Sequence, residues 1–255
     1  MPPHPEEPQR LDQIETRWSL LRLAHQATLP QSGPARNELA MLYRRAIRAY
    51  VGALVSEQQD ADELSQEVLV RLLSGNFHRA DPQRGRFRDL LKVSVANLVR
   101  NFWSRKGRRA GDLHDVSQLA DGAEDAADAQ WLAGWRSTLL DNAWAALQNH
   151  ERSHKGSITY TVLRLRADHP DDDSPQLAER LSTAVGKTVR ADALRQQLHR
   201  ARLRFAQFLI EEVARSVDPP TPERVEEELI EIGLIDYVRD FLPPDWHETG
   251  SLVEA

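Results

Sequence analysis

The sequence contains no cysteine among its 255 residues. This absence excludes disulfide bonds, thiolate catalysis and zinc sites that need sulfur ligands. No run of about 18 apolar residues is present, and the opening MPPHPEEPQR lacks the apolar core of a secretory signal. We therefore expect a cytoplasmic protein without a membrane partner.

Strand patterns and catalytic motifs are also scarce. Alternating Val, Ile or Thr runs bounded by turns do not recur, and the best candidate, SITYTVLRLR, also fits a helix. GKT at 186–188 lacks the upstream glycine of a phosphate-binding loop, because position 181 is Leu. His150 and His154 lack a third metal ligand. We predict an all-α protein that is not an enzyme and holds no metal or cofactor.

Charge is abundant and segregated along the chain, although the net formal charge is only -6. Residues 84–109 contain nine Lys or Arg and one acid, whereas residues 110–131 contain six acids and no Lys or Arg. Residues 176–206 contain seven basic residues and two acids, and residues 211–255 contain thirteen acids and three Arg. Two basic blocks therefore alternate with two acidic blocks.

Apolar spacing predicts three helices before residue 110. The first follows Pro34. The second starts near Asp60, which we expect to cap it, and ends around 74–75. The third follows the turn DPQRG and carries the first basic block on its outer faces. The residues expected to be buried are Leu39, Leu42, Tyr43, Ala46, Ile47, Tyr50 and Leu54, then Leu64, Val68 and Leu72, then Phe87, Leu91, Val95, Leu98 and Phe102.

An Ala- and Asp-rich segment from about 110 to 129 has little to bury and is typical of a linker. Beyond it, Trp131, Trp135, Leu139, Trp144 and Leu147 are expected to form the core of a second domain. Ser174-Pro175 predicts a helix start with Ser174 as the cap, and a long basic helix follows a glycine-containing turn from about Arg190. Helix, turn, helix is the order that DNA-reading units use.

The chain breaks again at Asp218-Pro219-Pro220, and a helix restarts at Thr221-Pro222-Glu223. We expect its apolar face to include Val225, Leu229, Ile232 and Tyr237. This acidic extension must dock on another surface or remain frayed. We interpret it either as a mask for a basic surface of the same chain or as a docking site for a regulator.

The basic blocks favour nucleic-acid binding over a merely solvated face, because lysine and arginine that neutralise phosphates release counterions. Arg and Gln of the second block suit the base edges of guanine and adenine. In the first block, NFWSRKGRR at 101–109 sets two aromatic rings beside cations, and unpaired bases stack on such rings. We assign Phe102 to the core and Trp103 to the exposed face.

A family resemblance joins these features. DADELSQEVLVRLL at 60–73 and FHRADPQRGRFRDLLKVSVANLVRNFWSRKGRR at 77–109 resemble the second region of ECF-type RNA polymerase sigma factors. The acidic linker and the terminal helix-turn-helix resemble their fourth region. ETRWSLLRLAHQA and the segment from LHRARLRFAQFL to IDYVRDFL look like the sigma-like proteins abundant in planctomycetes. The turn between Leu181 and Arg190 is longer than that of most such factors.

The resemblance implies three sets of site residues. Contacts with core polymerase fall to Asp62, Glu63, Gln66, Glu67 and Arg71. Contacts with the promoter minus-ten element, duplex and melted, fall to Arg86, Arg88, Lys92, Asn97, Arg100, Asn101, Trp103, Arg105, Lys106, Arg108 and Arg109. Contacts with the minus-thirty-five element fall to Arg190, Arg195, Gln196, His199, Arg200 and Arg202.

The sequence thus predicts a transcription initiation factor whose partners are core RNA polymerase, promoter DNA and an anti-sigma protein or other regulator. The expected divisions are a region 2-like domain at 11–109, a linker at 110–130, a region 4-like domain at 131–217 and an extension at 218–255. The alternative is a helix-turn-helix regulator that acts without polymerase, and a hydrolase with a scattered site comes third. A standalone regulator has no need for the acidic face at 60–73.

Overall fold

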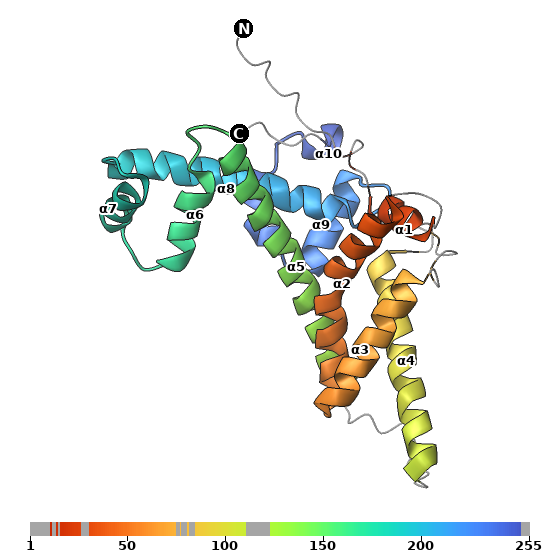
Figure 1. The fold of residues 1–255 in the computed structure, drawn as a ribbon. Helices are drawn as coiled ribbons and strands as arrows, with labels where there is room; N and C mark the ends of the chain where they lie inside the picture. Colours follow the sequence, from red (N-terminus) through yellow and green to blue (C-terminus); the bar gives the residue numbers. More distant parts are fainter. Residues whose placement is uncertain are drawn as a thin grey trace. The chain divides into compact units, whose positions relative to one another are not determined.

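The computed structural model describes residues 11, 14, 16–26, 31–74, 77, 81, 85–110 and 123–250, without the side chains of residues 107–110 and 249. Every regular element in these ranges is a helix (Figure 1), so the predicted all-α class is confirmed. No helix in the described ranges is both long and apolar enough to cross a membrane.

The chain divides into two compact units. The N-terminal unit comprises Glu15–Thr138 and Arg215–Pro220, and the C-terminal unit comprises Met1–Ile14, Leu139–Ala214 and Thr221–Ala255. The division falls inside one long helix, α5 (Ala123–Ser153), which contributes residues to both units.

The N-terminal unit contains α1 (Arg17–His25), α2 (Ser32–Leu54), α3 (Gln58–Leu73), α4 (Phe87–Ala110) and the first half of α5. Helix α2 contacts α1, α3 and α4. The predicted apolar positions of α2, α3 and α4 are buried, except Phe102, which is half-buried. Burying one such side chain contributes about 1.5 to 3 kcal/mol, so these stripes account for the packing of the helices.

Helix α3 begins earlier than the sequence suggested. Its first residue is Gln58, its N-cap is Glu57, and no side chain caps it. The prediction that Asp60 is the cap is therefore wrong. Asp60 lies inside the first turn, where its carboxylate binds Lys106 of α4 at 2.5 Å.

The predicted linker is shorter than expected, because α5 already begins at Ala123. Trp131 packs edge-on against Tyr50, and Trp135 stacks on Tyr43 with ring centroids 5.1 Å apart. Both tryptophans belong to the core of the N-terminal unit, not to that of a second domain as predicted. Between them, a Cβ on Gly134 would lie 2.8 Å from the Cα of Ala46, so glycine permits the close crossing of α2 and α5.

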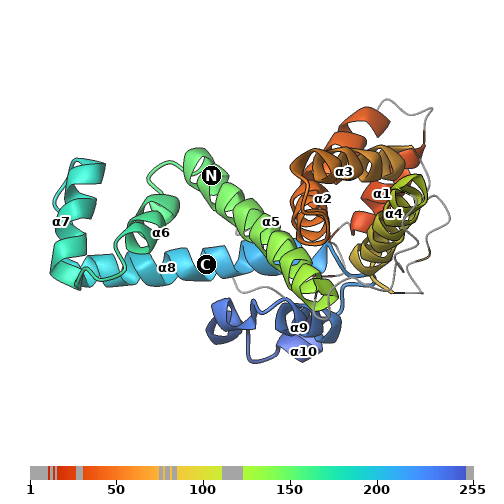
Figure 2. The ribbon, with the colours of Figure 1, turned by 90° about the horizontal axis from the view of Figure 1, so that it is seen from below.

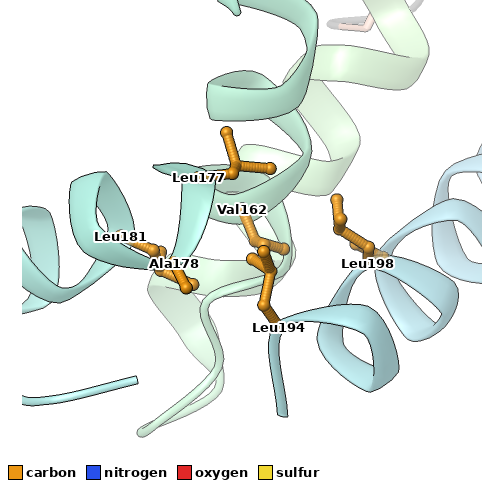
Figure 3. Packing of buried hydrophobic residues seen from close by; sticks show 7 residues of the cluster. Val162, Leu177, Ala178, Leu181, Leu194 and Leu198 are labelled. Carbon is orange, nitrogen blue, oxygen red and sulfur yellow. The ribbon is translucent and has the colours of Figure 1, made fainter. Parts of the chain in front are cut away.

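The C-terminal unit contains α6 (Thr159–Asp168), α7 (Ser174–Val185) and α8 (Ala191–Ala214) beside the second half of α5. Helices α6 and α7 both contact α8 and each other, and Figure 2 shows them grouped beside its first half. Their shared core contains Val162, Leu177, Ala178, Leu181, Leu194 and Leu198, whose side chains point toward one another (Figure 3). Leu147 is buried, and Trp144 packs against Tyr160 and Phe205.

The start of α7 differs from the prediction by one residue. Asp173 is the N-cap, and its carboxylate accepts a hydrogen bond from the Gln176 backbone N–H, while the Gln176 side chain accepts one from the Asp173 N–H. This capping box satisfies two amide groups at the helix start. Ser174 is therefore the first helical residue and not the cap.

The extension after Pro220 folds onto the C-terminal unit. A helix restarts at this point, as predicted: Thr221 caps α9 (Pro222–Glu231), and α9 contacts α8. Val225, Leu229 and Ile232 are buried, whereas Tyr237 is 55% exposed, so the prediction for Tyr237 is wrong. Two 3-10 turns, η3 (Ile235–Tyr237) and η4 (Arg239–Phe241), lead to α10 (Trp246–Thr249). Of the two alternatives, docking or fraying, α9 docks, and the surface that it uses belongs to its own chain.

Candidate nucleic-acid interface

Helix α4 carries the first basic block with its polar residues facing outward. Its apolar stripe is buried, which leaves a polar face that includes Asn97, Arg100, Asn101, Arg105 and Lys106, all exposed. Arg86 and Lys92 are half-buried. The Arg105 Nε–H donates to the Asn101 carbonyl at 3.3 Å, and an Arg100 N–H donates to the Asn97 side-chain oxygen at 3.2 Å.

Two predicted contact residues of α4 cannot be placed on this face, and a third is excluded. The side chains of Arg108 and Arg109 lie outside the described residues. Arg88 is only 2% exposed, with Nε 3.8 Å from the Asp89 carboxylate. This burial contradicts the prediction that Arg88 contacts DNA. Arg88 falls on the inner side of α4 beside Phe87, a position that the charge count alone could not distinguish.

Three cations of α4 are engaged by carboxylates of the same unit. Lys92 Nζ lies 2.9 Å from an Asp128 oxygen, and an Arg100 guanidinium nitrogen lies 3.2 Å from a Glu124 oxygen, both acids being on α5. Lys106 Nζ lies 2.5 Å from Asp60 and 3.1 Å from Glu57, at the start of α3. Hydrogen bonds to Asp60 and Glu57 raise the pKa of Lys106, so this side chain stays protonated.

The acids of α5 also act on Tyr50 of α2. Burial raises the pKa of the Tyr50 hydroxyl, and the negative charges of Asp128 and Glu124 raise it further, against the opposing field of Arg100. Tyr50 therefore stays neutral. The point where α2, α4 and α5 meet is a cluster of alternating charges and not an uninterrupted basic surface.

The aromatic pair at 102–103 does not divide into one buried and one exposed ring. Both rings are half-buried and pack edge-to-face with centroids 5.3 Å apart. Lys106 Nζ lies 5.6 Å from the centroid of each ring, within the range of a cation–π contact. The Trp103 indole N–H is buried and has no hydrogen-bond partner among the described residues. Trp103 is thus less exposed than predicted.

The residues predicted to contact polymerase share one face of α3. Glu63, Gln66 and Arg71 are exposed, and Asp62 and Glu67 are half-buried. Asp62 binds Arg48 of α2 at 2.9 Å, and Glu67 binds Arg71 at 2.5 Å. A hydrogen bond from Gln58 and the charge of Arg48 lower the pKa of Asp62 below the usual value of an Asp.

Sequence reasoning missed two neighbours of this face. Val70 on α3 is 61% exposed. It could have been recognised in the sequence as an apolar residue that falls outside the buried stripe of Leu64, Val68 and Leu72. Arg48 was also missed, because it lies on another helix and its spacing on α2 gives no hint of Asp62.

Helix α8 carries the second basic block. The six predicted contact residues are all exposed, namely Arg190, Arg195, Gln196, His199, Arg200 and Arg202. Leu194 and Leu198 face the core, so the exposed residues on α8 occupy its outer side. Arg190 lies just before the helix and pairs with Asp192 at 3.3 Å. Within the described residues, no carboxylate lies within ion-pair distance of Arg200 or Arg202.

The connection between α7 and α8 is compact, contrary to the prediction. Helix α7 continues past Leu181 to Val185, and the turn spans only residues 186–190. Gly186 takes a left-handed conformation, with φ of 69°, that a helix end favours. The Ser182 hydroxyl accepts a hydrogen bond from the Val189 N–H at 2.8 Å and donates to the Ala178 carbonyl at 2.7 Å.

Comparison with known families identifies the middle of the N-terminal unit. Residues 39–109 match the family model for sigma-70 region 2, a match that covers less than a third of the chain and includes α3 and α4. Neither the curated proteins nor the solved structures contain a significant match. The match supports an RNA polymerase sigma factor of the sigma-70 family, whose members are non-enzymatic initiation factors. In that family, region 2 binds core RNA polymerase and promoter DNA.

Proposed function

We propose that the chain is an ECF-type sigma factor that brings core RNA polymerase to specific promoters and assists their opening in the cytoplasm. The observation that carries the proposal is the outer face of α3. It lies within the residues that match sigma-70 region 2, its apolar side is used for packing, and its carboxylates point outward. Asp62 is one of these carboxylates, and its contacts with Gln58 and Arg48 lower its pKa further below the physiological range.

DNA contacts fall to α4 and α8 in this proposal. The exposed Asn97, Asn101 and Arg105 of α4, with the partly exposed Trp103 ring, would hold the melted strand at the minus-ten element. The outer side of α8, with α7 and the compact turn, would act as the second helix of a helix-turn-helix in the major groove at the minus-thirty-five element. Binding energy would drive melting, because no nucleotide-binding motif was found in the sequence.

The burial of its apolar stripe favours the interpretation that the extension masks a surface of its own chain over the one in which the stripe docks a regulator. Val225 and Leu229 are buried, so a regulator cannot use them without undocking α9. Near the proposed DNA face of α8, the ring of Phe241 lies 6.0 Å from the His199 ring. An anti-sigma protein, if one binds, would need a different surface from this stripe.

Capture of core RNA polymerase by the full chain tests the proposal. We expect the wild-type chain to bind core and to support transcription from a promoter in a reconstituted system. Asp62→Lys combined with Glu67→Lys should weaken core binding by about tenfold or more, because like charges would then meet across the interface. The matched control is Glu227→Lys with Glu248→Lys, two exposed acids of the extension, which should leave core binding unchanged.

The competing function is a helix-turn-helix regulator that acts without polymerase. Its support is the set of exposed α8 cations, which suit duplex binding by themselves. Tight duplex binding with no capture of core at low salt would favour this function and contradict the sigma-factor proposal. If the chain captures core and the Asp62→Lys and Glu67→Lys changes do not weaken this binding, the sigma-factor proposal stands but α3 is not part of the interface.

A further inference from the structure

The first turns of α5 lie against Lys92 and Arg100, two α4 cations that the family resemblance assigns to promoter DNA. Glu124 pairs with Arg100 and Asp128 pairs with Lys92. The acid nearer the start of α5, Glu124, pairs with the cation nearer the end of α4, Arg100. The first turns of α5 therefore run antiparallel to α4. All four side chains keep some exposure, from 29% for Lys92 to 57% for Glu124, so a soluble anion can reach the pairs.

The spacing of these carboxylates suits a site for a strand of phosphates. Four residues of helix rise by about 6 Å, which separates Glu124 from Asp128 along α5. A strand of duplex DNA carries a charge about every 3.4 Å along the axis, whereas a melted strand is flexible and can set two of its phosphates at this separation. Cations that can bind two carboxylates at this spacing are therefore placed to bind two phosphates.

The acid-bearing turns are held less firmly than the rest of the N-terminal half of α5. Ala127 is buried, but residues 124–126 are exposed, and the large buried anchors, Trp131 and Trp135, come later. The start of α5 can therefore release Lys92 and Arg100 while the tryptophans stay packed against α2. Helix termini open at low cost because few buried contacts hold them.

We propose that residues 123–130 of α5 are an intramolecular competitor of the melted promoter strand for Lys92 and Arg100 of α4. The inference rests on the proposed function of α4. In the free protein, Glu124 and Asp128 occupy the two cations, and DNA must displace both carboxylates before its phosphates bind. The start of α5 thus lowers the affinity and the salt dependence of DNA binding at this surface.

The test uses the full chain and a fluorescent single-stranded oligonucleotide of mixed sequence, with anisotropy measured over a range of salt concentrations. Glu124→Gln combined with Asp128→Asn should bind about two- to tenfold more tightly at low salt, as expected from the loss of two exposed ion pairs. The slope of log K against log salt should steepen by up to about 1.4, because each of two additional neutralised phosphates of a single strand contributes about 0.7.

A matched control separates contact from net charge. Asp125→Asn with Glu38→Gln removes two exposed acids of the same unit, and neither has an ion-pair partner among the described residues. We expect the control to change affinity much less than the contact variant. If the two variants raise the affinity for the oligonucleotide equally, the proposal that the start of α5 competes with DNA is wrong. Wild-type affinity in the contact variant would also contradict it, provided that circular dichroism shows unchanged helix content.

Failure of the underlying function has a different signature. Lys92→Gln with Arg100→Gln should weaken binding of the oligonucleotide, and in this background the changes at Glu124 and Asp128 should have little further effect. If the lysine and arginine changes leave affinity unaltered, α4 does not bind DNA through these cations, and the proposed function of α4 fails together with the inference. If they weaken binding while the acid changes do nothing, only the inference fails.

Discussion

Helices α4 and α8 both carry a dense block of cations, but their surroundings differ. On α4, Lys92, Arg100 and Lys106 are each bound by carboxylates of the same unit. On α8, Arg200 and Arg202 have no carboxylate within ion-pair distance among the described residues. The density of positive charge in a sequence therefore does not determine how available the cations are in the fold. A polyanion would reach these two α8 cations without displacing a described carboxylate, whereas at Lys92, Arg100 or Lys106 it would have to displace one.

The origin of the difference can be traced along the chain. The acids that follow the first basic block, Glu124 and Asp128, fold back onto α4 because Trp131 and Trp135 dock α5 on α2. Two of the acids that follow the second block, Glu212 and Glu228, lie apart from the cations of that block. Glu212 accepts a hydrogen bond from Asn142 at 2.9 Å, and Glu228 is buried.

The largest effect is expected from a change that loosens the N-terminal half of α5, because the acids that pair with α4 would then be released and α4 would resemble α8. Trp135→Ala removes a fully buried ring that stacks on Tyr43, and we expect it to lower the free energy of unfolding by about 3 to 5 kcal/mol. Urea unfolding followed by circular dichroism measures the change. Ala126→Ser, on the exposed side of the same helix, should stay within about 0.5 kcal/mol of wild type. An unchanged midpoint for Trp135→Ala would place this ring outside the core.

A smaller effect tests the available cations of α8. Arg200→Gln with Arg202→Gln should weaken duplex binding, with about 1 to 3 kcal/mol lost for each side chain that grips a base edge. Where the contacts are to phosphates instead, the salt slope should fall by about one for each cation lost. Fluorescence anisotropy with a labelled duplex distinguishes the two cases.

The control for α8 is Arg239→Gln, which removes a cation of the same unit that already pairs with Asp236 at 3.4 Å. It should leave duplex affinity nearly unchanged. If the two variants behave alike, α8 contributes only to net charge, and the contrast with α4 disappears.

The smallest expected effect tests whether α4 binds a single strand by stacking a base on the Trp103 ring as well as by its charge. Trp103→Ala should weaken single-strand binding by about 1 to 3 kcal/mol, the usual contribution of one stacked base, with less effect on duplex binding. Trp103→Phe keeps a ring and should retain most of the affinity. Permanganate footprinting of an open promoter complex provides a second readout. Equal losses for single and double strands would assign Trp103 to packing with Phe102.

Local patterns predicted most of the helices. The spacing of Leu39, Tyr43 and Ile47 on α2 and of Leu91 and Val95 on α4 determined which faces are buried, and both were predicted correctly. Such spacing is a property of a single helix, so one sequence is enough to read it. The start of α9 at Pro222 followed in the same way from Thr221 and the prolines before it.

Some errors were local, such as the caps expected at Asp60 and Ser174, but others concern contacts between segments that are distant in sequence. The linker was extended to residue 130 because the Ala- and Asp-rich composition has few apolar residues, yet Ala127 and Trp131 suffice to dock α5. Arg88 was counted with the surface cations because charge counts ignore helix phase. The partners of Lys92 and Lys106 lie 36 and 46 residues away, and no pattern within one helix reveals them.

The Ser182 hydroxyl at the end of α7 has a consequence for how this protein tolerates change in length. It binds the Val189 N–H across the turn, two residues before α8 begins at Ala191, and so ties the start of α8 to the end of α7. Each residue of slip would rotate the helix by about 100°, which would turn Leu194 toward solvent and carry a different side chain to the outer surface. Short loops normally accept insertions, but between Gly186 and Arg190 a single added residue would change which amino acids α8 presents.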